Sequence, residues 1–443
     1  MKARARLSAR LPVPRGFRFA AAAAGVKKGG VPKLRDDLGL VEVPGGASAA
    51  AVFTSNRVVA APLAVGREHL RAGGGRLRAV IVNSGNANCA TRSGAQACAR
   101  ICAALARELR VAARQVFPAS TGVIGVELPV RKILRALPRL LLRRQATPAA
   151  ARRFARAIMT TDTRPKLAAA RFRCGRKRAL LRSASSRGQA TLLGIAKGAG
   201  MIQPRLHLAG QSWHRPLAGV NTGGTPVPPH ATMLVYLLTD AAASPATLAR
   251  ALRAACARTF NRISVDGDTS TNDTVLLLAS GAAGARIASA ADARRFSEAL
   301  TAVCGSLARQ IVADGEGVQR VVELTVEGAR AEPEAERVAR AIANSPLVKT
   351  AWAGADPNWG RILAAIGNAG VPVNPQRVDI YLGSQLVCRG GRAVPFNERR
   401  AHRELARSSF PVRVRLRRGR AAATFLTCDL TVDYVRINAH YRT

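Results

Sequence analysis

The chain has 443 residues, of which 48% are hydrophobic and only 4% aromatic, so it is long enough for two or three domains and a large core. Lys and Arg number 69 against 26 Asp and Glu, a formal net charge of +43. No apolar run approaches the roughly 18 residues that a membrane-spanning helix requires. The basic start also lacks the apolar segment of a secretory signal. The composition therefore indicates a globular protein and excludes a bundle of membrane helices.

The positive charge raises the alternative of a nucleic-acid-binding protein, because such a field attracts phosphate without sequence specificity. Aromatic side chains that could stack on bases are scarce. The arginines are also dispersed among alanines, as in residues 131–156. A basic nucleic-acid-binding protein is therefore the non-enzyme alternative, and we regard the charge as a solvated surface.

The eight cysteines are scattered along the chain and form neither a C-x-x-C pair nor a cluster with histidine. A zinc site is not expected from this pattern, and the sequence predicts no metal. The even count alone does not indicate disulfides in a chain of this length. We expect reduced, buried thiols in a cytoplasmic protein.

The first elements alternate between strand, loop and helix. Residues 77–82 (LRAVIV) form a β-branched run typical of a buried strand, and residues 83–88 (NSGNAN) have the composition of a tight loop. Residues 92–113 predict an amphipathic helix. Residues 117–125 (FPASTGVIG) predict the end of a strand followed by a loop.

The middle of the chain changes character twice. Residues 130–158 have a helical composition that Pro138 and Pro148 should interrupt. Residues 204–229 are rich in Pro, Gly, His and Thr and lack a useful period, which predicts a flexible insert.

The second half resumes with strands and helices. Residues 232–240 (TMLVYLLTD) predict a buried strand and residues 246–259 a helix. Further β-rich runs lie at residues 378–383, 412–416 and 433–438. This alternation predicts an α/β or α+β architecture in which mixed sheets are covered by helices.

Several segments concentrate glycine and small polar residues within apolar surroundings. They are STGVIG (120–125), MTTDTRPK (159–166), GIAKGAGMI (194–202), HATML (230–234), NRISVDGDTSTNDT (261–274), VADGEG (312–317), NSPLVKTAWAGADPNWGRI (344–362) and the terminal NAHYRT (438–443). Each is weak alone. As an ordered set, from GFRFAAAAAGVKKGG (16–30) to the last residue, they resemble the ornithine acetyltransferase / glutamate N-acetyltransferase family of arginine biosynthesis.

The resemblance implies a layered sandwich of mixed sheets and helices of the self-cleaving N-terminal-nucleophile type. Ala231 and Thr232 match the bond that the family cuts. Residues 1–231 would then form an alpha chain and residues 232–443 a beta chain that begins with the nucleophile. The two chains are expected to stay associated, as a heterotetramer of two alpha and two beta chains.

The chemistry of an N-terminal threonine supports this interpretation. A threonine hydroxyl is a weak nucleophile unless a base lies beside it. Once Thr232 is N-terminal, its own α-amine supplies that base, with a reference pKa near 8. Without the flanking motif, Thr232 would be read as a β-branched residue at the start of a buried strand.

The resemblance also assigns the remaining site residues. Thr121 and Gly122 match the family's oxyanion-hole pair, which suits acyl transfer because donors must face the developing oxyanion. The residues implied to bind substrate are Thr160, Lys197, Thr232, Glu316, Asn438 and Thr443. Thr161 is the close alternative to Thr160, and for Lys197 and Glu316 the alternative interpretation is a solvated surface charge. Residues 266–273 (DGDTSTND) lack the terminal Glu of a calcium loop and are expected to be structural or active-site scaffolding.

The implied function is transfer of an acetyl group from N2-acetyl-L-ornithine to L-glutamate through an acetyl-threonine intermediate. The resemblance implies no prosthetic group, and it leaves open whether acetyl-CoA also serves as an acetyl donor. A related N-terminal-nucleophile amidase or aminopeptidase, which passes the acyl group to water, is the enzymatic alternative.

The chain departs from the family pattern immediately before the nucleophile. The segment between Lys197 and Thr232 is about 24 residues longer than in the family, with the atypical insert at residues 205–228. Pro229 and His230 also replace the usual Asn and Met. Because Pro229 removes a backbone donor near the scissile bond, a processing-impaired family member is a further alternative.

Overall fold

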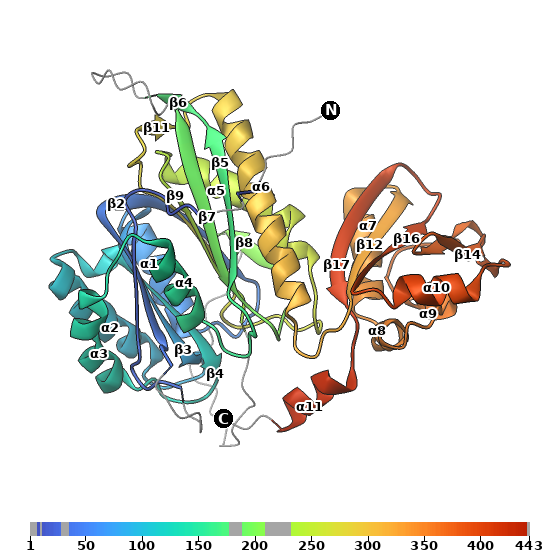
Figure 1. The fold of residues 1–443 in the computed structure, drawn as a ribbon, viewed down its shortest axis with the longest axis horizontal. Helices are drawn as coiled ribbons and strands as arrows, with labels where there is room; N and C mark the ends of the chain where they lie inside the picture. Colours follow the sequence, from blue (N-terminus) through green and yellow to red (C-terminus); the bar gives the residue numbers. More distant parts are fainter. Residues whose placement is uncertain (1–6, 9–10, 28–34, 177–187, 209–231, 441–443) are drawn as a thin grey trace.

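The computed structural model describes residues 7–8, 11–27, 35–176, 188–208 and 232–440. Figure 1 shows two α/β units side by side, joined by the segment that follows the long helix α6. The first unit is built around a nine-stranded sheet and the second around a six-stranded sheet.

The nine-stranded sheet has the order β4-β3-β2-β10-β9-β7-β5, with β1 and β8 paired to β2. Only the pairs β3–β4 and β9–β10 are parallel. Its strands are β1 (Arg18–Ala22), β2 (Leu38–Thr54), β3 (Arg76–Asn86), β4 (Val116–Val123), β5 (Lys166–Arg173), β7 (Gln189–Lys197), β8 (Leu206–Leu208), β9 (Leu234–Thr239) and β10 (Thr274–Ala279). A short ribbon beside it pairs β6 (Gly175–Arg176) with β11 (Ala285–Arg286).

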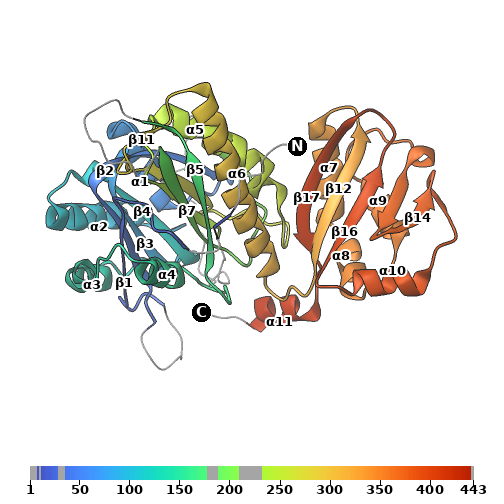
Figure 2. The ribbon, with the colours of Figure 1, turned by 45° about the horizontal axis from the view of Figure 1, so that its top comes forward.

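Helices cover both faces of this sheet, as Figure 2 shows. On one face pack α5 (Pro245–Arg258) and α6 (Ala290–Ala313). The same face also carries α2 (Gly94–Leu109) and α3 (Val130–Leu142), over the β3 and β4 end of the sheet. On the other face lie α1 (Ala61–Ala72) and α4 (Pro148–Ala157). Short 3-10 turns occur at Ala113–Gln115, Phe260–Arg262 and Pro375–Arg377.

Strand β9 lies inside the sheet, between β10 and β7, and is buried on both faces. Val235 and Leu237 enter the core beneath α5 and α6. Tyr236 enters the opposite core, where its ring meets Phe154 of α4 edge to face at 5.6 Å. Because successive side chains of a strand point to opposite faces, a continuous apolar run is what such a central strand requires.

The six-stranded sheet has the order β15-β14-β13-β16-β12-β17. Its strands are β12 (Val321–Ala329), β13 (Asp379–Leu382), β14 (Gln385–Arg389), β15 (Arg392–Ala393), β16 (Ser409–Arg415) and β17 (Ala421–Cys428). The accompanying helices are α7 (Glu332–Ala343), α8 (Pro346–Ala353), α9 (Trp359–Gly367) and α10 (Glu398–Leu405). The last helix, α11 (Val432–His440), leaves this unit and turns back toward the first sheet (Figure 1).

Most elements expected from the sequence are present, including the strands around residues 77–82, 232–240, 378–383 and 412–416 and the helices within 92–113 and at 246–259. The mixed sheets covered by helices confirm the predicted α/β architecture.

The expected interruption at Pro138 is wrong, because Pro138 lies inside α3. Ile133, Leu137 and Leu140 of this helix are buried, and this packing outweighs the backbone hydrogen bond that proline removes. At Pro148, by contrast, α4 begins, with the Thr147 hydroxyl accepting a hydrogen bond from the backbone of Ala150.

Two expected loops are strand instead. Residues 83–86 continue β3, and residues up to 123 continue β4, because the two segments pair with each other in parallel. Their polar side chains are satisfied across the pair, since the Ser120 hydroxyl donates to Asn83 Oδ1 at 2.6 Å. Composition predicted a loop, and mutual pairing of the two polar segments overrode it.

The expected strand at residues 433–438 is a helix, α11. Six residues of alternating pattern fit either structure, and no described strand edge pairs with this segment. A helix satisfies its own backbone groups, so it forms where a pairing edge is missing. At the predicted insert, Leu206–Leu208 form β8 against β2, while residues 209–231 lie outside the described part of the chain.

Candidate active site

Thr232 lies two residues before the start of strand β9 and is 1% exposed. Its Oγ1 is 2.8 Å from the Oγ of Ser270. The backbone of the next residue is held on both sides: Met233 N donates to Asp273 Oδ1 at 2.9 Å, and Met233 O accepts from Thr274 N at 3.0 Å. The hydroxyl of Thr232 therefore occupies a fixed position at the end of the sheet.

Lys197 is the last residue of β7 and pairs in register with Leu234 of β9. Its side chain is 0% exposed, which excludes the solvated surface charge that was the alternative interpretation. The ammonium donates to Thr160 Oγ1 at 2.8 Å and to Thr121 Oγ1 at 3.3 Å. Lys197 thus joins the predicted oxyanion hole to the predicted substrate site.

Gly198 brings the lysine segment close to the nucleophile. With φ at +152°, it adopts a backbone conformation that favours glycine, and a Cβ there would lie 3.5 Å from the carbonyl oxygen of Thr232. The turn that follows is anchored by Asp266, which accepts hydrogen bonds from Met201 N at 2.6 Å and Ile202 N at 2.9 Å.

Thr121 and Gly122 stand side by side in β4. Thr121 is fully buried, and its hydroxyl accepts from Lys197 while keeping its own proton free to donate elsewhere. Gly122 has φ at +134°, and a Cβ there would lie 2.2 Å from the carbonyl carbon of Gly85 in β3. Only glycine fits this position, because β3 and β4 approach each other so closely.

A buried carboxylate, Asp162, connects the groups around Lys197. It accepts from Lys166 Nζ at 2.6 Å and from Gly198 N at 2.6 Å, and its Oδ2 lies 3.7 Å from Lys197 Nζ. Burial alone would raise the pKa of Asp162, but the ammonium groups of Lys197 and Lys166 outweigh burial and lower the pKa to about 2. Asp162 is therefore an anion. Burial lowers the pKa of Lys197, and Asp162 opposes that effect.

The polar segment at residues 266–273 is the scaffold that the sequence indicated. Besides holding the turn at Met201, it places Ser270 against Thr232. Asn272 donates through Nδ2 to the carbonyls of Ala87 and Ser120, at 2.8 and 2.9 Å. One segment thereby fixes the nucleophile, the lysine turn and the end of β4 relative to one another.

Two carboxyl groups of this scaffold have raised pKa values because of burial. The pKa of Asp266 is raised to about 6 and that of Asp273 to about 8. Asp273 Oδ1 accepts from Met233 N, whereas its Oδ2 is buried without a hydrogen-bond partner. At neutral pH Asp273 is therefore mainly protonated, which avoids an uncompensated buried charge beside the nucleophile.

A cleft of about 420 Å³ opens next to these residues, large enough for an amino acid. It is lined by Thr160, Thr161, Thr163 and residues 314–317, together with Arg436 and Ile437 of α11. Thr160 belongs both to this cleft and to the hydrogen-bond network of Lys197. The cleft therefore connects through Lys197 to the end of β7, which pairs with the strand that follows Thr232.

Glu316 and Asn438 meet in the cleft region, where Asn438 Nδ2 donates to Glu316 Oε2 at 3.0 Å. The backbone of Glu316 is held by its N–H, which donates to Ala199 O at 2.9 Å. Its carboxylate lies against Gly200, where a Cβ would be only 2.4 Å from Oε2. The glycines of the lysine turn thus leave room for the Glu316 side chain.

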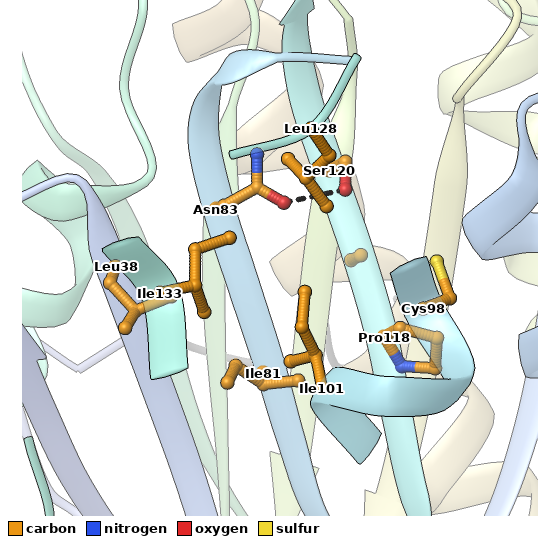
Figure 3. A pocket seen from close by; sticks show the side chains of 10 residues that line it. Leu38, Ile81, Asn83, Cys98, Ile101, Pro118, Ser120, Leu128 and Ile133 are labelled. Atoms are coloured by element: carbon orange, nitrogen blue, oxygen red, sulfur yellow. Dashed lines mark hydrogen bonds between the residues drawn. The ribbon is translucent and has the colours of Figure 1, made fainter. Parts of the chain in front are cut away.

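A second void lies between β3, β4, α2 and α3, beside the Asn83–Ser120 hydrogen bond (Figure 3). It measures about 10 Å³ and is lined mainly by Leu and Ile side chains, so it holds no more than one water molecule. In the described ranges, no group of three His, Cys, Asp or Glu side chains could hold a metal ion. None of the described helices is long and apolar enough to cross a membrane.

The structure brings together Thr232, Thr121, Gly122, Thr160 and Lys197. Glu316 and Asn438 join them through the cleft. Ala231 and Thr443 lie outside the described residues. Thr161 also lines the cleft, with its hydroxyl oxygen buried and without a hydrogen-bond partner.

Sequence reasoning missed Asp162, Ser270 and Asp273 as individual residues. All three lie within polar segments that the sequence singled out, MTTDTRPK and DGDTSTND. The signal that could have found them is a charged or hydroxyl side chain within a segment that the sequence predicts to be buried. Which partner each one meets depended on contacts between distant segments.

The ArgJ family model matches residues 18–443. The chain is 43% identical to the arginine biosynthesis bifunctional protein ArgJ of Methylococcus capsulatus, over 97% of this chain and 95% of that protein. It is 42% identical to the protein of the same name from Geobacter sulfurreducens, over 97% and 99%. A solved structure of ornithine acetyltransferase from Mycobacterium tuberculosis, complexed with ornithine, is 35% identical and covers 46% of this chain and 99% of that chain, with a TM-score of 0.38.

Proposed function

Because the chain belongs to the ArgJ family, we propose that it transfers the acetyl group of N2-acetyl-L-ornithine to L-glutamate, with Thr232 as the nucleophile. The observation that carries this proposal is the buried Thr232 hydroxyl, held by Ser270 in the segment that leads into β9. That strand pairs with the end of β7, where Lys197 bonds Thr121 and also Thr160 of the substrate-sized cleft. The family relationship favours an acyltransferase of arginine biosynthesis over an amidase or a nucleic-acid-binding protein.

Self-cleavage is the first step of the proposed mechanism. The Thr232 hydroxyl attacks the carbonyl carbon of residue 231, the peptide bond to the Thr232 nitrogen breaks, and water hydrolyses the resulting ester. The products are a new carboxylate on the alpha chain and a free α-amine on Thr232. Ser270 supports this step because it fixes the hydroxyl before any α-amine exists.

Transfer then proceeds in two half-reactions. The α-amine of Thr232 accepts the hydroxyl proton while Oγ1 attacks the acetyl carbon of acetylornithine. The tetrahedral oxyanion is stabilised by Thr121 and Gly122, and ornithine leaves with the proton. The amine of glutamate attacks the acetyl-threonine ester and regenerates the free hydroxyl. This sequence needs neither a metal nor a prosthetic group, and acetyl-CoA could load the same threonine.

The charged groups of the site match the charges of the substrates. The Glu316 carboxylate suits an ammonium group of ornithine, and the positive Lys197 favours the substrate carboxylate and the oxyanion. Asn438 supports Glu316 through its amide. All eight cysteines are buried and unpaired, which supports a reducing compartment such as the cytoplasm.

Strands on both sides of the proposed cut share one sheet. Strand β9 pairs with β7, and β10 pairs with β2. Residues from before and after position 231 also fill both cores of the first unit. Separation of the two chains would expose these cores, so we expect them to remain associated after cleavage. A heterotetramer of two alpha and two beta chains is the proposed assembly, which light scattering of the native protein tests.

The purified protein is expected to run as two bands of about half the full mass on a denaturing gel, with Thr232 at the start of the second chain. The reason is that Thr232 needs a free α-amine to act as its own base. Intact-mass spectrometry measures the cut, and an acetylornithine–glutamate assay measures transfer. A single uncut chain with full transfer activity would contradict the mechanism. Partial cutting would instead show that Pro229 and His230 slow the processing step.

Substitution of Gly200 by alanine is expected to raise KM without unfolding the protein. The added methyl group would lie 2.4 to 2.6 Å from the Glu316 carboxylate, which is the movable end of a flexible side chain. Glu316 should therefore move in the cleft while the backbone stays in place. Thermal unfolding and steady-state kinetics measure the two effects.

The matched control for this substitution is Gly367→Ala at the end of α9, where a Cβ meets no atom within 4 Å. This control should change neither the melting temperature nor KM appreciably. Unchanged KM values for both substrates in Gly200→Ala would show that Glu316 does not bind them.

A further inference from the structure

Besides its contacts with two threonine hydroxyls, Lys197 belongs to a buried row of charged side chains. Four buried side chains alternate in sign: Lys197, Asp162, Lys166 and Asp314. Asp162 lies between the two ammonium groups, 2.6 Å from Lys166 Nζ and 3.7 Å from Lys197 Nζ. Lys166 also contacts Asp314 Oδ2 at 2.5 Å. All four are at most 3% exposed at the side chain, so solvent screens these interactions little.

We propose that Asp162 is a positioning residue of the acetyl-transfer reaction, which keeps the Lys197 ammonium charged and directed at the Thr121 and Thr160 hydroxyls. The inference rests on the proposed function, since it names the residue that prepares Lys197 for that reaction. Asp162 does not line the cleft, and it acts only through Lys197 and the turn that follows.

The contacts of Asp162 fix both the place and the charge of Lys197. Oδ1 accepts from the backbone N–H of Gly198, at 2.6 Å, and so holds the residue next to Lys197 in the chain. Oδ2 accepts from Thr160 N at 3.1 Å, which holds the second partner of the ammonium. One carboxylate thus orients the backbone next to Lys197 and the threonine whose hydroxyl accepts a hydrogen bond from the Lys197 ammonium.

Four titratable groups influence how readily Lys197 keeps its proton. Burial lowers the pKa of Lys197 most, Asp162 raises it, Lys166 lowers it and Glu316 raises it. Asp273 raises it only where its own carboxyl, with a pKa of about 8, is ionised. The α-amine of Thr232 adds a further basic group after cleavage. Among the described charged groups, Asp162 is thus the largest influence that favours the ammonium form. A lysine buried without such a partner loses its charge near neutral pH.

The test compares two variants that differ only at Asp162. In Lys166→Met, Asp162 keeps Lys197 as its ammonium partner. In Lys166→Met/Asp162→Asn, Lys197 has lost that carboxylate, while the side-chain shape at position 162 is preserved. The pair avoids leaving two buried ammonium groups without Asp162, which a single Asp162→Asn substitution would do. Both proteins are used as processed full chains, and their thermal transitions are recorded.

The basic limb of the pH profile of kcat/KM is the readout. Relative to the parent, Lys166→Met should shift this limb to higher pH, because a like charge near Lys197 is gone. In the double variant the basic limb should lie at lower pH than in the parent and in Lys166→Met. The reason is that Asp162, which favours the Lys197 ammonium more strongly than Lys166 opposes it, is also gone. At pH values above both limbs, the kcat/KM of the double variant should lie below that of Lys166→Met by about tenfold for each pKa unit that separates the limbs.

A third variant, Lys166→Met/Asp162→Glu, separates charge from packing. It keeps the carboxylate but has a longer side chain, whereas Asn keeps the shape and loses the charge. The proposal expects the basic limb of the Glu variant to lie closer to that of Lys166→Met than the basic limb of the Asn variant does.

Two outcomes would overturn the proposal. In the first, the basic limb of the Asn variant lies at the same pH as that of the Glu variant or at a higher pH. In the second, the limbs of all three variants coincide. If the parent itself transfers no acetyl group, the proposed function fails instead. If the Asn variant does not fold, Lys166→Met/Asp162→Ser replaces it, and a limb that is not lower than that of Lys166→Met then overturns the proposal.

Discussion

Replacement of Thr232 by alanine is expected to abolish both self-cleavage and acetyl transfer, because one hydroxyl performs both attacks. Transfer should fall by about 10³-fold or more, the scale of loss when an enzyme loses its nucleophile. The protein should stay folded, since removal of this hydroxyl costs one hydrogen bond to Ser270, about 1 kcal/mol. Intact mass after expression reports cleavage, and release of ornithine in the presence of glutamate reports transfer.

Two further variants make this result specific. Thr232→Ser keeps a hydroxyl and an α-amine and should retain part of both activities. Thr239→Ala removes a buried hydroxyl at the other end of the same strand, where it donates to Thr191 O at 2.8 Å, and should leave both activities close to those of the parent. Normal transfer by uncleaved Thr232→Ala would place the nucleophile at another residue.

Replacement of Gly122 by alanine is expected to destabilise the protein by at least about 3 kcal/mol, because the new methyl group overlaps the neighbouring backbone. A Cβ at this position would lie 2.2 Å from Gly85 C and 2.3 Å from Asn86 N, and neither atom can move without separating β3 from β4. The left-handed φ of +134° adds strain for any residue with a Cβ. Denaturant unfolding measures the loss, and transfer activity should fall with it because Thr121 lies in the same strand.

Gly125 provides the matched control for this substitution. Its φ is also positive, at +80°, but a Cβ there meets no atom within 4 Å. Gly125→Ala should therefore cost only the backbone strain, about 1 kcal/mol. Equal losses in the two variants would show that strain alone, and not the contact between β3 and β4, determines the requirement for glycine at position 122.

The sequence alone determined the elements with long and consistent patterns. The continuous apolar run of β9 indicates a strand that is buried on both faces. The amphipathic patterns of α2 and α5 indicate helices that are buried on one side. The resemblance of the segment around Thr232 to the family's cleavage motif likewise predicted Thr232 as the nucleophile.

The tertiary structure alone decided the partners of the site residues and the conformations that they impose. Lys197 was open to interpretation as a surface charge, and only the packing of β7 buries it against Thr121, 76 residues away in the chain. The same holds for Asp162, which is kept ionised by two lysines that only the fold brings beside it. It also holds for Gly122, whose positive φ accompanies the close approach of β3. The helix α11 formed where a strand was expected, because backbone pairing depends on whether a free sheet edge lies nearby. Each of these features is set by contacts between distant segments, and the free energy of such contacts exceeds the local preference of the residues involved.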